Sequence, residues 1–114
     1  MFSTTSGDYR IEQAVLDTDL KDVRSFVEYF DVPPDLFDRV AAGNRNILLE
    51  IDFVDNGNRK RAQLNINGHL TFLDQIEPYY TRTISAVVEP GSRNYLELIP
   101  ETPLDIVQIR VRVQ

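Results

Sequence analysis

The sequence predicts an all-β protein, an antiparallel jelly-roll β-sandwich with one short helix. Two observations support this fold class. From Ile47 onward, apolar and polar residues alternate in short runs, and turn sequences such as Asn-Gly and Pro-Gly separate these runs. A period of two is the pattern of a strand with one buried face. Several short strands at this spacing are typical of a sandwich or barrel.

The N-terminal region gives weaker signals than the rest of the 114-residue chain. Met1–Gly7 is short and polar, and it predicts a flexible N-terminal arm before a single sandwich domain at residues 8–114. A first strand around Ile11 fits the pattern only in part. The block Asp19–Phe30 has apolar residues at helical spacing, but its β-branched and aromatic side chains also suit a strand. We expect a strand at Arg24–Phe30.

One short helix is expected after this strand. Proline is favoured in the first helical turn, and a proline pair precedes an apolar stripe made by Leu36, Phe37 and Val40. Gly43 is suited to end the helix. The sequence therefore predicts a helix of about two turns at Pro34–Ala42, which is stable only when it is docked on the sandwich.

Beyond the helix, turn sequences separate the expected strands. Asparagine and glycine adopt positive φ at low cost, so Asn67-Gly68 indicates a two-residue hairpin turn. Pro90-Gly91 suits a type II turn, and Asn94 is expected to lock it by hydrogen bonding to nearby backbone. The expected segments are strands at Ile47–Phe53 and Ala62–Ile66, a strand with Leu70 and Phe72, a loop at Asp74–Tyr80, and strands at Thr83–Val88, Tyr95–Ile99 and Ile106–Val113.

The same alternation predicts which side chains form the core, because the apolar member of each pair faces inward. The residues expected to be buried are Leu49, Ile51, Phe53, Leu64, Ile66, Val88, Leu96, Leu98, Ile109 and Val111.

Three segments together are similar to a known group of sandwiches: Gln63–His69, Ile84–Leu98 and Leu104–Ile109. Their order of strands and turns resembles the galactose-binding-like jelly rolls, which include carbohydrate-binding modules and accessory domains of glycoside hydrolases. The resemblance covers about Leu48–Val113, and its Gly91–Asn94 step is one residue longer than usual. It implies the jelly-roll fold and a function in binding rather than catalysis, and its motifs are structural turns.

Composition excludes some functions and disfavours others. The chain has no cysteine, so it has no disulfide, thiolate metal site or cysteine nucleophile. Its net charge of −6 disfavours nucleic acid as a partner, and it has no apolar run long enough for membrane insertion. Met1–Gly7 lacks the features of a signal peptide. The localisation stays open between a cytoplasmic or virion protein and a domain of a longer exported protein.

Enzymatic activity is not expected. His69 is the only histidine, and its place after a turn indicates a solvated side chain. No serine lies in a nucleophile motif. Glu50 and Asp52 share one strand face with Cβ atoms roughly 7 Å apart, near the spacing that a glycosidase uses, but such pairs are common on polar strand faces.

Tyr79, Tyr80 and Arg82 are the leading candidates for ligand binding. Sugars are held by aromatic faces packed against their C–H groups and by planar polar side chains. Two tyrosines in a loop after Pro78 fit such a platform, although one of them also fits the end of the sandwich core.

Arg59, Lys60 and Arg61 form a basic island in an acidic chain, and Arg59 and Arg61 are candidates for contact with an anionic glycan or an acidic partner. A hairpin tip that faces only water is the commoner reading of such charges. Arg110 and Arg112 are expected to point outward from the last strand, where they would protect a sheet edge from unwanted pairing.

Asp17, Asp19 and Asp22 are the candidate metal ligands. Their carboxylates suit a structural calcium ion, and the resemblance implies calcium near an early loop. A solvated acidic turn is the alternative, because the spacing of a twelve-residue calcium loop is absent from the sequence. No other cofactor is expected.

These observations leave two functions from different classes. The first is a non-catalytic carbohydrate-binding or accessory module that belongs to a larger protein or complex. The alternative is a structural or assembly subunit that binds protein partners in a virion, a secretion apparatus or a polysaccharide-export apparatus. The partner is then a glycan or a protein, and the oligomeric state is left open.

Overall fold

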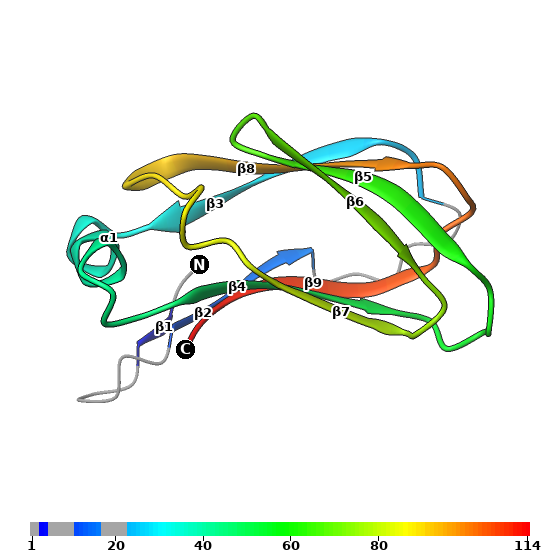
Figure 1. Cartoon of the computed structure of the whole chain (residues 1–114), viewed down its shortest axis with the longest axis horizontal. Helices are drawn as coiled ribbons and strands as arrows, with labels where there is room; N and C mark the ends of the chain where they lie inside the picture. Colours follow the sequence, from blue (N-terminus) through cyan, green and yellow to red (C-terminus); the bar gives the residue numbers. More distant parts are fainter. Residues whose placement is uncertain (1–2, 5–10, 17–22) are drawn as a thin grey trace.

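Two antiparallel sheets lie face to face in the computed structural model, with one helix at an end of the sandwich (Figure 1). The structure describes residues 3–4, 11–16 and 23–114, and for the first two of these ranges it describes the backbone alone. The five-stranded sheet has the order β1 (Ser3–Thr4), β2 (Ile11–Leu16), β9 (Ile106–Val113), β4 (Ile47–Phe53) and β7 (Tyr79–Thr83). The four-stranded sheet has the order β3 (Phe26–Val32), β8 (Gly91–Pro100), β5 (Lys60–Ile66) and β6 (His69–Gln75).

The strand pairing is that of a jelly roll. β2 pairs with β9, β3 with β8, β4 with β7, and β5 with β6, always antiparallel. The chain therefore folds as one long hairpin that wraps around the core, and the turn between β5 and β6 is its tip. Further pairing of β4 with β9 and of β5 with β8 completes the two sheets. The predicted all-β jelly-roll sandwich with one short helix is confirmed.

The tip of this hairpin has the turn that the sequence predicts. Asn67 has φ of 52° and Gly68 has φ of 89°, so both central residues are left-handed, as a type I′ turn requires. The buried Asn94 side chain accepts a hydrogen bond from the Asn67 amide at 2.9 Å and donates to the carbonyls of Glu89 and Gly91. Asn94 thus locks the turn before its strand, as expected, and also ties it to the β5–β6 turn.

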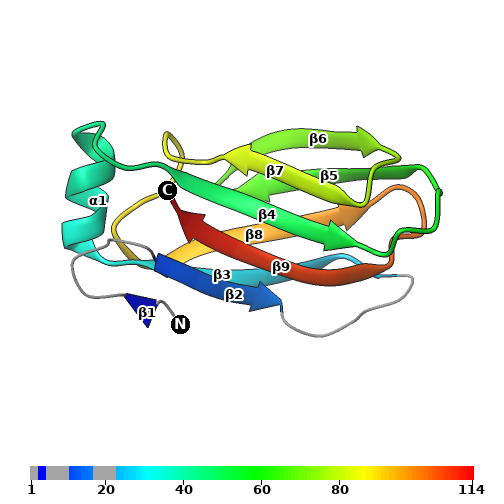
Figure 2. The same ribbon diagram turned by 90° about the horizontal axis from the view of Figure 1, so that it is seen from below.

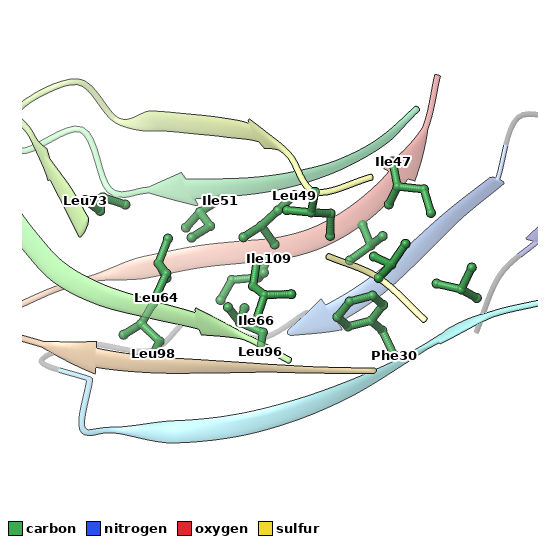
Figure 3. Close-up of a cluster of buried hydrophobic side chains, with 14 of the residues drawn as sticks. Phe30, Ile47, Leu49, Ile51, Leu64, Ile66, Leu73, Leu96, Leu98 and Ile109 are labelled. Atoms are coloured by element: carbon green, nitrogen blue, oxygen red, sulfur yellow. The ribbon is translucent and has the colours of Figure 1, made fainter. Parts of the chain in front are cut away.

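The core lies between the two sheets, where side chains from both interdigitate (Figure 3). All ten residues predicted to be buried are buried. In β9 the period of two is interrupted, because the pairing with β4 shifts between Asp52 and Phe53. Val107 is the extra residue of this bulge and is exposed, so Ile106 and Ile109 both remain in the core.

The predicted helix is confirmed as α1 (Pro34–Ala41), which covers one end of the sandwich (Figure 2). Leu36 and Val40 bury their side chains against the core, and Phe37 packs beside them. Gly43, with φ of 82°, follows the last turn and ends the helix. Docking on the sandwich thus stabilises a helix that is too short to persist alone.

The strand expected at Arg24–Phe30 is confirmed as β3, although its bounds are Phe26 and Val32.

Two predictions about the connections after β6 and β7 were wrong. The loop expected at Asp74–Tyr80 is reduced to residues 76–78, because both strands extend into it. The Gln75 amide donates to the carbonyls of Glu77 and Tyr79, which closes this tight connection.

The strand expected at Thr83–Val88 was the second error, since β7 ends at Thr83 and a turn follows. Ile84 and Val88 are buried, but they cover the end of the sandwich from this turn. The Val87 amide donates to the Ile84 carbonyl at 3.1 Å within the turn. The error arose because β-branched residues are frequent in strands, and the same side chains also suit a turn that covers the end of the sandwich.

In the region of the predicted N-terminal arm, Ser3–Thr4 pair with β2 as the short strand β1. The other residues of Met1–Gly7 lie outside the described part of the chain. Among the residues that the structure describes, no helix is long and apolar enough to cross a membrane.

Candidate functional site

A network of charged side chains lies on the outer face of the five-stranded sheet. We call Glu50, Asp52, Tyr79, Arg110 and Arg112 the Glu50 network. Arg110 donates through Nε to Glu50 Oε1 and through Nη1 to Asp52 Oδ2, each at 2.7 Å. Arg112 Nη2 lies 2.9 Å from Glu50 Oε2, and the Tyr79 hydroxyl donates to the same oxygen. The Glu50 carboxylate is therefore surrounded by donors, and its residue is only 1% exposed.

Strand register builds this network. Glu50 of β4 lies opposite Arg110 of β9, and Asp52 lies opposite Tyr79 of β7 on the other side. Side chains two residues apart on one strand share a face, so the acidic and basic rows run parallel and meet. β9 lies between β2 and β4. The expectation that Arg110 and Arg112 protect a sheet edge was therefore wrong, although both point outward.

The charges of the network set its protonation state. Burial alone raises the pKa of the Glu50 carboxyl, but the hydrogen bonds from Tyr79 and Arg110 and the charges of both arginines lower it below its ordinary value. Burial, followed by the hydrogen bond to Glu50, raises the pKa of the Tyr79 hydroxyl. Glu50 is thus held ionised and Tyr79 neutral at pH 7. An acid catalyst needs a raised carboxyl pKa instead.

The predicted tyrosine platform is divided between two faces of the molecule. Tyr79 and Tyr80 are consecutive residues of β7, so their side chains point in opposite directions. Tyr80 and Arg82 share the inner face, where Tyr80 packs against the core. Burial raises the pKa of the Tyr80 hydroxyl, and Arg82 acts in the opposite direction. Of the two tyrosines, Tyr79 is the one with an exposed ring, and its hydroxyl already donates a hydrogen bond to Glu50.

Carboxylates of β6 and of the segment after β8 neutralise the two arginines of the basic island. Arg59 donates to both oxygens of Asp74, at 2.8 and 3.1 Å. Arg61 lies 3.8 Å from Asp74 and 3.9 Å from Glu101. Lys60 points inward between them and is 3% exposed. Its Nζ donates to the carbonyls of Asn58 and Ile76, so this lysine holds the hairpin together.

A second surface, on the outer face of the four-stranded sheet, carries exposed rings. Tyr29 is 63% exposed on β3, and Phe72 is 67% exposed on β6. The strand register connects them through partly exposed polar side chains of β8 and β5, with Asn65 opposite Glu97 and Gln63 opposite Phe72. We call this surface the aromatic–amide face. Its residues are Val27, Tyr29, Gln63, Asn65, Leu70, Phe72, Tyr95, Glu97 and Ile99.

The side chains of the aromatic–amide face hold one another in place. The rings of Tyr29 and Tyr95 lie side by side, with centroids 6.3 Å apart and planes tilted by 56°. The Asn65 amide donates to the Glu97 carboxylate at 3.1 Å. The Asn65 Oδ1 atom is buried and has no hydrogen-bond partner among the described residues. This acceptor lies beneath the surface of the face, so the groups that a ligand can reach there are the more exposed ones around it.

The remaining predicted residues do not join either surface. His69 is the exposed first residue of β6, which agrees with the expected solvated position. The proposed calcium ligands Asp17, Asp19 and Asp22 lie outside the described residues. Within residues 23–114, no group of three or more His, Asp or Glu side chains is arranged to hold a metal ion.

Sequence reasoning did not include Tyr29 and Phe72 among the candidate ligand-binding residues. A signal for Tyr29 was present, because Phe26, Val27, Tyr29 and Phe30 are too many apolar groups for one buried face of a strand. In β6 the inward position belongs to Leu73 and not to Phe72. Leu70 and Phe72 alternate with Thr71 as a buried pair would, so the sequence pattern does not reveal this difference.

Comparison of the chain with protein-family models finds no match, and neither do the searches of curated proteins and of solved structures. The geometry of these two surfaces is therefore the basis for a functional proposal.

Proposed function

We propose that this protein is a non-catalytic carbohydrate-binding module and that the aromatic–amide face is its binding surface. The observation that carries the proposal is the pair of exposed rings, Tyr29 and Phe72, on either side of a row of amide and carboxylate groups. Aromatic faces pack against sugar C–H groups, while planar polar side chains bond the hydroxyls. This face offers both kinds of contact.

The arrangement favours a linear oligosaccharide that lies across the strands. Tyr29 and Phe72 belong to the edge strands β3 and β6, and β8 and β5 lie between them. Three interstrand steps separate the edges by about 14 Å, and the register also offsets the rings along the strands, because Tyr29 pairs with Tyr95 whereas Phe72 is level with Ile99. The two rings are therefore about 19 Å apart on a diagonal. A chain of several sugar rings can then stack on an aromatic side chain at each end. Its central hydroxyls then reach the partly exposed side chains of Gln63, Asn65 and Glu97.

Two further observations support binding without catalysis. The acidic pair that resembles a glycosidase site, Glu50 and Asp52, is bound by Arg110. The lowered pKa of Glu50 also opposes service as a general acid. The residues predicted from the sequence, Tyr79, Tyr80, Arg82, Arg59 and Arg61, stay a second candidate set, and Tyr79 offers the exposed ring among them.

A glycan array with matched alanine variants tests the proposal. We expect the wild-type protein to bind neutral oligosaccharides. Tyr29→Ala and Phe72→Ala should each lower binding at least tenfold while leaving the melting temperature close to that of the wild type. Tyr79→Ala is the control, because it removes an exposed aromatic ring from the opposite sheet. The proposal fails if the wild type binds no glycan, or if Tyr79→Ala abolishes binding and the other two variants retain it.

A protein-assembly subunit is the alternative function, and one observation favours it. Val27 and Leu70 are exposed aliphatic residues at the two edges of the aromatic–amide face. Aliphatic side chains contribute to protein interfaces by burial, whereas they offer a sugar neither stacking nor hydrogen bonds. If the array shows no glycan, pull-down of a partner by the wild type but not by Val27→Lys or Leu70→Lys would support the assembly function.

A further inference from the structure

We propose that β6 pairs antiparallel with β6 of a second copy of this chain, so that two four-stranded sheets become one continuous sheet across a two-fold axis. The proposal does not depend on glycan binding. It rests on the backbone of the β6 edge, on the lack of protection of that edge, and on the side chains that the pairing would bring together.

The backbone of β6 has unused donors and acceptors on its outer side. A type I′ turn makes Ile66 and His69 a hydrogen-bonded pair, and hydrogen-bonded pairs then alternate along the hairpin. The N–H and C=O groups of Leu70, Phe72 and Asp74 consequently point away from β5. Among the described strands, β6 has a neighbour only in β5, and it lies at one margin of the molecule (Figure 2).

The other sheet edges are poorer templates for strand addition. β1 spans two residues and β7 spans five. β3 is as long as β6, but its pairing with β8 shifts at a bulge between Phe30 and Val32. β6 keeps a regular register with β5 over all seven residues and contains no proline or lysine. Bulges, short strands, proline and lysine are devices that block edge pairing, and β6 lacks them.

The side chains of β6 favour one register for the second copy. With Thr71 at the two-fold axis, Leu70 lies opposite Phe72 of the other copy, and each such pair exchanges both of its N–H···O=C bonds. These two side chains are 54% and 67% exposed, and aromatic–aliphatic pairs across strands are stabilising. Asp74, the acidic residue of β6, lies beyond the paired stretch and keeps its contacts with Arg59 and Arg61.

The size of the contact indicates a modest affinity. Burial of Leu70, Phe72 and the strand backbone in both copies covers less than the roughly 1,000 Å² that stable specific interfaces bury. We therefore expect a weak dimer that forms at high micromolar and millimolar concentrations. Pairing would also place two aromatic–amide faces side by side on one extended sheet.

Sedimentation velocity over a concentration series tests the pairing. The wild type should change from monomer to dimer as the concentration rises. Leu70→Lys should remain a monomer at concentrations where the wild type is dimeric. Val27→Lys is the matched control, because it places the same charge on an exposed aliphatic position of the other edge strand, β3, and it should dimerise like the wild type.

A second variant tests the backbone directly. Phe72→Pro removes an N–H group that points to the free edge, so it leaves the β5–β6 bonds intact and abolishes dimerisation. A wild type that stays monomeric at millimolar concentration overturns the proposal, as does a dimer that Val27→Lys disrupts and Leu70→Lys does not. Glycan binding and dimerisation of Tyr29→Ala are measured separately, because this substitution lies on the aromatic–amide face but outside β6, so the failure of either proposal is seen independently of the other.

Discussion

On the outer face of the five-stranded sheet, Glu50 is 1% exposed because Arg110, Arg112 and Tyr79 surround its carboxylate. On the outer face of the four-stranded sheet, Phe72 is 67% exposed. Both faces are polar strand surfaces of the same sandwich. In the first, opposite charges meet across strands and satisfy one another. In the second, exposed aromatic rings lie beside partly exposed amide and carboxylate side chains.

This contrast shows how the two faces differ in what they can bind. A face whose charges are paired internally gains little from a ligand, since each new contact must replace an existing one. Exposed aromatic rings are only hydrated, so covering them with a ligand or partner is favourable. The Glu50 network therefore has the arrangement of a structural element, and the aromatic–amide face is the surface for which we propose binding.

The largest effect should come from comparing two phenylalanines. Phe53 is buried beneath both faces, so Phe53→Ala should lower the free energy of unfolding by about 3–5 kcal/mol through lost burial and a cavity. Phe72→Ala, its exposed counterpart, should cost less than about 1 kcal/mol. Urea denaturation measures both. Equal losses for the two variants would show that Phe72 is part of the core and would remove it from the binding face.

The next effect concerns the two glutamates of the opposite faces. Glu50→Ala leaves Arg110 and Arg112 without their buried partner, and it should cost about 3 kcal/mol. Glu97→Ala, on the open face, removes one hydrogen bond to Asn65 and should cost less than about 1 kcal/mol. Unfolding curves of both variants at neutral pH provide the comparison. A Glu50→Ala protein as stable as the wild type would contradict a structural role for the Glu50 network.

The smallest effect is the pH dependence of the Glu50 network. Because the folded protein lowers the pKa of Glu50 below its ordinary value of 4.5, the ionised carboxylate contributes stability above that pH. The contribution disappears as the pH falls through the folded-state pKa. The stability difference between wild type and Glu50→Gln should therefore be constant near neutrality and shrink below pH 4.5.

Phe72→Ala is the control for this series, because it removes no titrating group and its difference from the wild type should not change with pH. A Glu50→Gln difference that also stays constant down to the acid-unfolding region would refute the lowered pKa.

Much of the fold was predictable because its signals are local. Leu49, Ile51 and Phe53 alternate with polar neighbours, and the pleat of a strand converts that alternation into one buried face. Asn67-Gly68 makes a turn because both residues adopt positive φ. The helix at Pro34 follows from its prolines and its apolar stripe. Such signals act over a few residues, so neighbouring sequence contains all of the information.

The candidate site was less predictable because its parts come from distant segments. Nothing near Arg110 in the sequence indicates that its partner is Glu50, sixty residues away. The exposure of Phe72 depends on which face of β6 meets the core. Tyr79 and Tyr80 were expected to act together in a loop, but β7 begins at Tyr79, so their side chains point to opposite faces of the sheet.

The sequence by itself determined the secondary structure of most of this protein, its jelly-roll class and ten of its core residues, since strand period and turn chemistry are properties of short segments. The tertiary structure alone decided that β9 is an inner strand, that the acidic and basic rows neutralise each other, and that aromatic side chains of β3 and β6 share one open surface. Strand order and register create those contacts, and they depend on how the whole chain packs around its core.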